Sequence, residues 1–304
     1  MAGHSIASIQ GPPWTSRAFG QIAKSLFAVL FPSDCRVCGA PLVKISRLPV
    51  CQECLDAMHP IAGGICAICG ERLFSSYVLS TPESERCCGL CRRIKPPFAR
   101  AVAYGSYEGG LRELIHLLKY GGVRPAADVL GRVLAEAIAG LEPDFPDGSL
   151  IAVVPVPLYR GKHRHREFNQ AELIARAAMK LNPALGRLRL CAAALERKRE
   201  TASQTGLTSH QRRENVRGAF GVAQPEAVKA REVLVVDDVY TTGATVSECA
   251  RVLRRAGATK VWVATVARTL KAAGWQVEIQ QSGDADMEGV SSGPEVPLAR
   301  AAAS

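Results

Sequence analysis

From about residue 98 to about residue 270, short apolar segments alternate with longer segments in which apolar residues recur every three or four positions. The short apolar segments predict strands at 101–104, 150–154, 188–195, 233–236 and 260–266. The helical spacing predicts helices at 111–118, 130–141, 173–181 and 246–253. This alternation indicates an α/β fold, with a mainly parallel sheet and helices on both faces.

The segments on either side of this region lack so regular a pattern. Residues 1–18 mix glycine, proline and polar residues, which is typical of disorder. Five apolar residues then predict a short amphipathic helix: Phe19, Ile22, Leu26, Val29 and Leu30. We therefore expect a disordered N-terminus at 1–18, this helix with a cysteine-rich module at 19–97, the α/β domain at 98–270, and a flexible tail at 271–304.

The sequence offers no segment that is apolar over the roughly 20 residues that a membrane-spanning helix needs. The most apolar early segment, Ser25–Phe31, is too short for this and has no small-residue cleavage site. We expect a cytoplasmic protein without stable membrane insertion, in which the amphipathic helix packs on the protein itself.

Eight of the 11 cysteines form four pairs with two residues between their members. The pairs are Cys35/Cys38, Cys51/Cys54, Cys66/Cys69 and Cys88/Cys91. This spacing lets both thiolates of a pair face one metal ion, so it predicts Zn²⁺ in a reducing compartment. Sequential pairing gives two ribbons with four thiolates each, and a crossed pairing stays open, as does Cys87 in place of Cys88. A site closed by four thiolates has a structural role.

The formal net charge of +10 comes almost entirely from one segment. Leu158–Arg217 holds 14 Lys/Arg against 5 Asp/Glu, a balance of +9. Such a balance favours a surface that binds phosphates, diphosphate or nucleic acid over a merely solvated basic face. The basic run contains only two aromatic residues of the Phe, Tyr and Trp types, Tyr159 and Phe168. This small number weakens the case for stacking on single-stranded DNA.

The strongest chemical signal is VLVVDDVYTTGAT at Val233–Thr245. Its four apolar residues predict a buried strand, and Asp237 and Asp238 follow at the carboxyl end, where open α/β sheets bind ligands. Small or hydroxylated residues come next: Thr241, Thr242, Gly243, Ala244 and Thr245. Backbone N–H groups at the next helix start are suited to hold a phosphate, while the carboxylates can accept hydrogen bonds from sugar hydroxyls. The segment therefore predicts a 5-phosphoribosyl site.

Other ligand-binding loops fit this segment less well. Receiver domains also carry paired aspartates after an apolar strand, but near the start of a small domain and without the threonine-rich turn. Neither the Walker pattern nor the GxGxxG dinucleotide pattern occurs at this loop. A purely structural turn would have little use for two acids and three threonines.

The loop resembles the phosphoribosyl diphosphate (PRPP) motif of type I phosphoribosyltransferases. With the cysteine pairs in front, the chain resembles the ComF family of competence proteins, also called GntX-like, from about Phe31 to Arg268. The matching blocks are CRVCG at Cys35, LIHLLKYGG at Leu114, VVPVPLYRGKHRHREFNQ at Val153, TASQTGL at Thr201 and RRENVRGAFGV at Arg212. The chain departs from the family pattern at Glu167, where the family commonly has glycine.

The resemblance implies further PRPP ligands. Val154–Pro157 and the basic run after it take the place of the diphosphate loop, in which the backbone at Pro155 and basic side chains would hold the diphosphate. The basic side chains are Arg160, Lys162, Arg164 and Arg166. Lys119, at the end of the first helix, and Arg199, in the stretch that resembles the mobile hood of type I enzymes, are implied ligands too.

The implied reaction is substitution at the anomeric carbon of PRPP, with Mg²⁺ and basic residues neutralising the departing diphosphate. Asp237 and Asp238 are the candidate catalytic residues, since they would hold the ribose. We favour a ComF-like protein that binds PRPP with Mg²⁺ and takes part in DNA uptake, with single-stranded DNA and DNA-uptake or recombination proteins as partners. The alternative is an active PRPP-dependent transferase with an acceptor that the sequence does not identify.

Overall fold

A computed structural model describes residues 34–42, 47–75, 80–159, 161, 168–181, 186–202 and 207–270. The predicted disordered N-terminus, the amphipathic helix at 19–30 and the tail at 271–304 lie outside these residues. No helix in the described part of the chain is long and apolar enough to cross a membrane.

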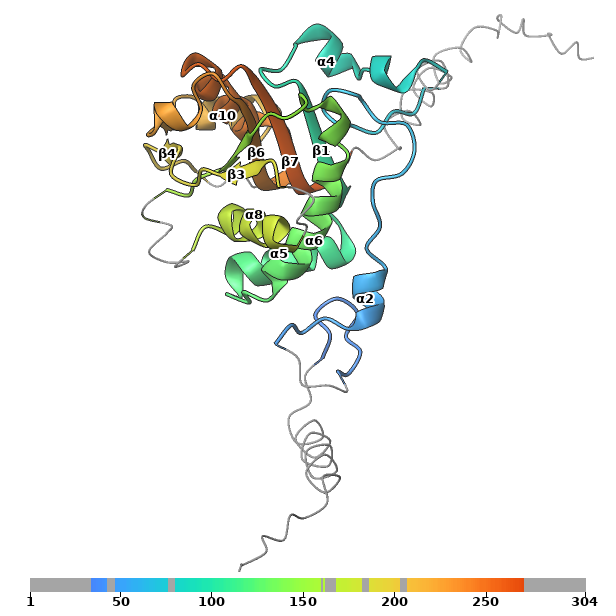
Figure 1. The fold of residues 1–304 in the computed structure, drawn as a ribbon. Helices are drawn as coiled ribbons and strands as arrows, with labels where there is room; N and C mark the ends of the chain where they lie inside the picture. Colours follow the sequence, from blue (N-terminus) through green and yellow to red (C-terminus); the bar gives the residue numbers. More distant parts are fainter. Residues whose placement is uncertain are drawn as a thin grey trace, which may run out of the picture. The chain divides into compact units, whose positions relative to one another are not determined.

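Five parallel strands form the central sheet in the order β1-β7-β6-β2-β3 (Figure 1). They are β1 (Arg100–Ser106), β2 (Ile151–Pro155), β3 (Leu188–Leu190), β6 (Glu232–Tyr240) and β7 (Lys260–Arg268). The inner strands are almost wholly buried, as parallel strands covered on both faces must be. The predicted parallel α/β fold is confirmed.

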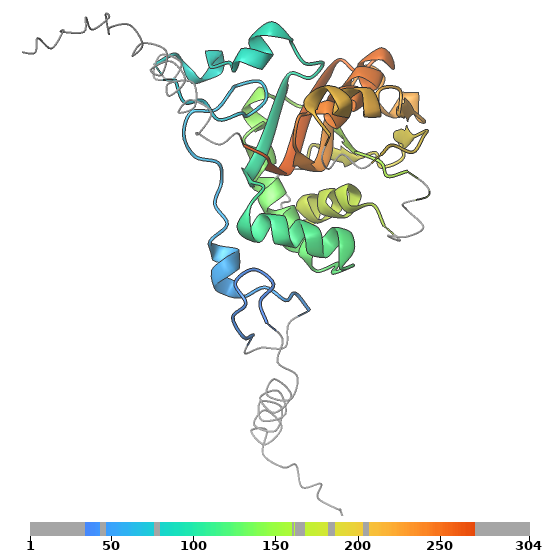
Figure 2. The same ribbon diagram turned by 180° about the vertical axis from the view of Figure 1, so that it is seen from behind.

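Helices cover both faces of this sheet (Figures 1 and 2). They are α5 (Gly109–Tyr120), α6 (Ala126–Ala139) and α8 (Gln170–Leu181) on one face and α10 (Ala244–Arg255) on the other. Alternate residues of β6 divide between the two layers because strand side chains alternate in direction. Leu234 and Val236 belong to the core beneath α5, α6 and α8, whereas Val233 and Val235 belong to the core beneath α10.

Two predicted strands differ from those observed. The segment predicted as one strand at 188–195 forms β3 in the central sheet and then β4 (Leu195–Arg197), which pairs antiparallel with β5 (Phe220–Val222). A turn separates them, closed by a hydrogen bond from the Ala194 amide to the Cys191 carbonyl. β6 also continues beyond its apolar residues to Tyr240, since it keeps pairing with β7, so both aspartates lie within the strand.

The helix α9 (Ser209–Val216) was not predicted from the apolar pattern, because its sequence SHQRRENV is almost entirely polar. Its start is instead fixed by a capping box between Thr208 and Gln211. We call β4, α9 and β5 together the hood. The buried Glu248 of α10 accepts a 2.7 Å hydrogen bond from the Gly218 amide and so ties the hood to α10.

Short elements make up the cysteine-rich module and the remaining connections. The module contains α2 (Gln52–Asp56), α4 (Gly89–Arg93) and the 3-10 turn η1 (Glu83–Glu85). Two further 3-10 turns, η2 (Glu142–Asp144) and η4 (Pro225–Ala227), lie in the α/β part. Each ribbon also has one isolated antiparallel bridge, Asp34 with Pro41 and Ile65 with Arg72.

Candidate functional site

The site lies where the connections of the sheet diverge. β2 continues through α8 to β3 on one side, while its neighbour β6 continues through α10 to β7 on the other. Ligands of open α/β sheets bind in the crevice at such a switch point, beyond the carboxyl ends of the strands. A cavity of about 480 Å³ opens there. Seven predicted ligands line it: Lys119, Asp237, Asp238, Thr241, Gly243, Ala244 and Thr245.

The two aspartates have different neighbours because they are consecutive in a strand. Asp238 is buried and lies on the same face of β6 as Val236, the face on the side of α5. There the Lys119 ammonium at the end of α5 lies 2.8 Å from Asp238 Oδ2. Asp237 lies on the same face of β6 as Val235 and interacts electrostatically with Arg197 of the hood.

Burial and charge set the protonation of this cluster. Burial, followed by the negative charge of Asp238, raises the pKa of Asp237 to about 7. Burial alone would lower the pKa of Lys119, but the two aspartates outweigh it and hold the pKa above its usual value. The cluster thus holds a charged ammonium beside one carboxyl that titrates near neutral pH.

Several polar atoms at this edge are prepared for a ligand. Thr242 Oγ1 and Gln170 Oε1 are buried, and the described residues supply neither of them with a hydrogen bond. Such buried atoms normally have partners. Gly243 has a φ of +75° at the start of α10, and no side-chain hydrogen bond caps that helix within the described part of the chain. The first amides of α10 and the Thr242 hydroxyl therefore suit a phosphate.

The predicted diphosphate loop is described only in part. Pro155 ends β2, and the next amide, of Val156, donates to the Val236 carbonyl at 2.9 Å. Asn169 Nδ2 donates to the Val156 carbonyl at 3.1 Å, and its Oδ1 accepts from the Ala171 amide, so it holds the two ends of the loop together. The predicted ligands Arg160, Lys162 and Arg166 lie outside the described residues, as does Arg164.

The hood presents different arginines from the one predicted. Arg199 is exposed and donates to the backbone carbonyls of Asn215 and Arg217, at 3.1 and 2.7 Å, which places it in the hood itself. Arg197 and Arg212 line the cavity instead. The Arg197 guanidinium lies 5.3 Å from the centre of the Phe220 ring and is hydrogen-bonded to Thr201.

Some lining residues were not predicted as ligands, among them Tyr107, Gln170, Tyr240 and Arg212. Three of these lie in segments that already stood out in the sequence: Gln170 and Arg212 in blocks that carry the family resemblance, and Tyr240 in VLVVDDVYTTGAT. Tyr107 lies between β1 and α5, and no motif of the sequence marks it. Pro155 and Thr242, both predicted ligands, lie at this edge without lining the cavity.

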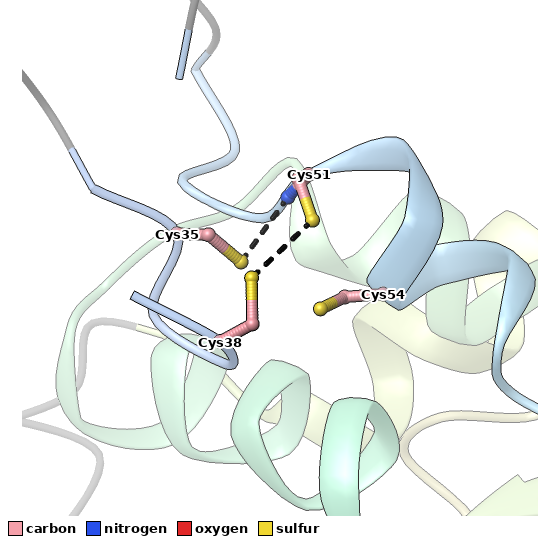
Figure 3. A group of neighbouring side chains, drawn as sticks. All are labelled: Cys35, Cys38, Cys51 and Cys54. Atoms are coloured by element: carbon pink, nitrogen blue, oxygen red, sulfur yellow. Dashed lines mark hydrogen bonds between the residues drawn. The ribbon is translucent and has the colours of Figure 1, made fainter. Parts of the chain in front are cut away.

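The cysteines group sequentially. The two groups are Cys35, Cys38, Cys51 and Cys54, shown in Figure 3, and Cys66, Cys69, Cys88 and Cys91. Within each group the ligand atoms all lie within 4.8 Å of one another, and Cys87 belongs to neither. Zn–S bonds of about 2.3 Å in a tetrahedron separate sulfurs by about 3.8 Å.

The observed sulfur distances match that value. The Cys38 and Cys51 sulfurs are 3.7 Å apart, as are those of Cys69 and Cys88. Backbone amides also donate to the thiol sulfurs, as metal-bound thiolates require of their surroundings; the Cys51 amide, for example, lies 3.3 Å from Cys35 Sγ. Both groups therefore fit a structural Zn²⁺ ion.

Comparison with known proteins agrees with both parts of the fold. Residues 26–94 match the model of the double zinc ribbon domain, and residues 174–282 match that of the phosphoribosyl transferase domain. The chain is 34% identical to DNA utilization protein YhgH of Escherichia coli K12 over 248 residues, covering 79% of this chain and 98% of that protein. It is 29% identical to competence protein F of Haemophilus influenzae, covering 72% and 96%.

A solved structure of the allosteric regulatory enzyme of purine biosynthesis is similar at 23% identity with a TM-score of 0.29, over 47% of this chain and 26% of that one. The sheet, the switch-point cavity and the cysteine groups define a phosphoribosyltransferase domain preceded by a double zinc ribbon. The chain belongs to the ComF family, together with the YhgH and competence F proteins.

Proposed function

We propose that this chain binds PRPP with Mg²⁺ at the carboxyl ends of β2 and β6. The observation that carries the proposal is the close association, in one cavity, of two aspartates with an uncapped helix start. A 5-phosphoribosyl group has a phosphate at one end and a hydroxylated ring at the other. The helix start suits the first and the carboxylates suit the second.

Each residue then has a definite task. The α10 amides and the threonines of 241–245 hold the 5-phosphate, and Asp237 and Asp238 accept hydrogen bonds from the ribose hydroxyls. The backbone after Pro155, with Arg160, Lys162, Arg164 and Arg166, receives the diphosphate. Bound Mg²⁺ would supply positive charge to the departing diphosphate. Lys119 neutralises the aspartate pair until the ligand replaces that contact.

We infer that the cellular role of this site is in DNA uptake or utilisation, through contact with single-stranded DNA. The names of the YhgH and competence F relatives support this role. The balance of +9 over Leu158–Arg217 supports the same conclusion, since phosphate contacts dominate the affinity of proteins for nucleic acids.

Turnover of PRPP is the second candidate function, and one feature of the cavity favours it. The cavity extends past the aspartates to Tyr107, Gln170 and Arg212. Gln170 Oε1 is buried there and receives no hydrogen bond from the described residues. A polar acceptor with an N–H group would satisfy it. Release of diphosphate in a screen of amine-type acceptors, with and without the Gln170→Leu change, tests this function directly.

The binding site itself is tested with calorimetry of PRPP and Mg²⁺ on the full chain. We expect Asp237→Asn and Asp238→Asn each to weaken PRPP binding at least tenfold, since a charge-assisted hydrogen bond is worth about 1.5–3 kcal/mol. Asp144→Asn is the control, because Asp144 pairs with Arg100 on the surface away from the cavity. Unchanged affinity in both aspartate variants would reject the site.

A further inference from the structure

A buried arginine joins the second ribbon to the end of the sheet. Arg268, the last residue of β7, is 3% exposed. Its guanidinium donates to the Cys69 carbonyl and lies 2.9 Å from Glu71 Oε2, both in the second ribbon. The edge strand β1 adds a further bond, from the Ala101 amide to the Ile68 carbonyl at 2.7 Å. The second ribbon is therefore fixed to the strands through its own backbone.

The same arginine contacts the segment Val233–Thr245, here called the phosphoribosyl loop, through the side chain of Tyr240. Its guanidinium lies 4.5 Å from the centre of the Tyr240 ring. The two residues are partners in the pairing of β6 with β7. A ring edge of Phe98 also packs on Tyr240, with centroids 6.5 Å apart. Tyr240 in turn fills the space beside Gly243, where a Cβ atom would overlap the tyrosine hydroxyl. The position of the ring thus limits the position of Gly243, where α10 begins.

The first ribbon makes its contacts elsewhere. It packs against β1, where the Tyr104 hydroxyl donates to the Met58 carbonyl at 3.1 Å, and against the start of α5, where a Cβ on Gly110 would meet the Cys54 carbonyl. The site residue of α5, Lys119, lies near the opposite end of that 12-residue helix. The two ribbons are alike in ligands but differ in their proximity to the loop.

We propose that Arg268 and Tyr240 are positioning residues, which make the conformation of the turn Thr241–Thr245 depend on the folding of the second ribbon but not of the first. The role of this turn in holding a phosphate rests on the function proposed above. The coupling itself does not, because it concerns contacts that exist without a ligand.

The main test is hydrogen exchange of segment 239–247 in the full-length, zinc-loaded chain without ligand. We expect Arg268→Met to speed exchange in this segment about tenfold, the size of effect that coupled neighbours typically show. Arg268→Lys keeps the charge and should restore part of the protection. The control is Trp262→Phe, also in β7, which removes a part-buried 2.7 Å hydrogen bond from the indole N–H to Glu232 of β6 and should leave the segment unchanged.

A matched pair of cysteine variants keeps the test decisive if Arg268→Met does not fold. Cys38 and Cys69 hold equivalent positions, each the second cysteine of the first pair in its ribbon. We expect Cys69→Ser to loosen segment 239–247 and Cys38→Ser to leave it protected. Equal effects of the two changes, or normal protection in a folded Arg268→Met variant, would overturn the proposal.

Calorimetry with PRPP separates this proposal from the proposed function. Should the wild-type chain fail to bind PRPP while Arg268→Met still loosens the segment, the function is wrong and the positioning role stands. Should the wild type and Arg268→Met bind PRPP equally, with equal protection of the segment, the positioning role is wrong and the function stands. Weaker binding together with faster exchange in Arg268→Met supports both.

Discussion

At the scale of single residues, the aspartate pair illustrates how two consecutive positions in a strand give the same side chain different neighbours. Asp238 faces α5 and has the Lys119 ammonium 2.8 Å away. Asp237 has no such close ion pair among the described residues, and burial beside Asp238 raises its pKa to about 7. Two identical side chains thus have different surroundings, and those of Asp237 favour its neutral form.

This difference predicts the pH dependence of PRPP binding. Ribose hydroxyls need the ionised carboxylate as acceptor, so binding should release a proton from Asp237 when the pH is below its pKa of about 7. Affinity should therefore rise about tenfold from about pH 6 to about pH 8, as the ionised fraction does. Calorimetry in buffers of different ionisation enthalpy measures the released proton.

The control for this prediction is Asp237→Asn, which cannot titrate. It should retain only the pH dependence of PRPP itself, with no proton released by the protein. An identical proton release in wild type and Asp237→Asn would show that Asp237 is ionised throughout this range and would contradict the prediction.

At the scale of elements, the hood shows where the apolar pattern stops being informative. α9 carries almost no apolar residues, so helical periodicity cannot detect it, although its capping box is present in the sequence. The turn after Leu190 divides one predicted strand between two sheets. Arg199, an implied PRPP ligand, donates to carbonyls within the hood, whereas Arg197 lines the cavity.

The segment between β2 and α8 carries a prediction about DNA. If its basic residues contact single-stranded DNA, Arg160→Gln with Lys162→Gln should weaken binding and reduce the salt dependence. The expected change in slope is about 1.4 for two lost phosphate contacts. Fluorescence anisotropy with a labelled oligonucleotide over a range of salt concentrations measures it.

The matched control changes the same number of charges on α10, with Arg254→Gln and Arg255→Gln, both of which are exposed. This control should keep the wild-type slope. Equal slopes in all three proteins would show that the segment between β2 and α8 is not the DNA contact.

At the scale of the whole molecule, the cysteine-rich module is part of the packed structure. Cys35, Leu48 and Val50 of the first ribbon belong to the core that includes α5 and α6. Cys66, Cys69 and Cys91 of the second belong to the core that includes α10. Each ribbon has few apolar residues of its own, so we expect its fold to depend on metal binding.

Zinc removal gives the prediction at this scale. Metal analysis of the purified chain should find two Zn²⁺ ions, and the Cys38→Ser variant should lose one of them, since each group has four thiolates. A strong chelator should make residues 34–95 susceptible to proteolysis while the sheet resists it. A chain that contains no zinc, or one whose ribbons resist proteolysis after chelation, would contradict this prediction.

The sequence by itself determined the features that depend on local spacing. Apolar periodicity located the strands and helices of the sheet, because side-chain direction repeats every 2 residues in a strand and every 3.6 in a helix. The CxxC spacing indicated metal ligands, and VLVVDDVYTTGAT indicated a ribose-phosphate site. The family resemblance added Lys119, which lines the cavity beside Asp238.

Only the tertiary structure decided which distant groups meet. It grouped the thiols sequentially and assigned Cys88 rather than Cys87 to the second site. It brought Arg268 against Glu71, 197 residues away, and against the ring of Tyr240 on the neighbouring strand. Such contacts depend on strand order and on the packing of layers, which local spacing does not encode, and they decide how the ribbons and the phosphoribosyl loop are connected.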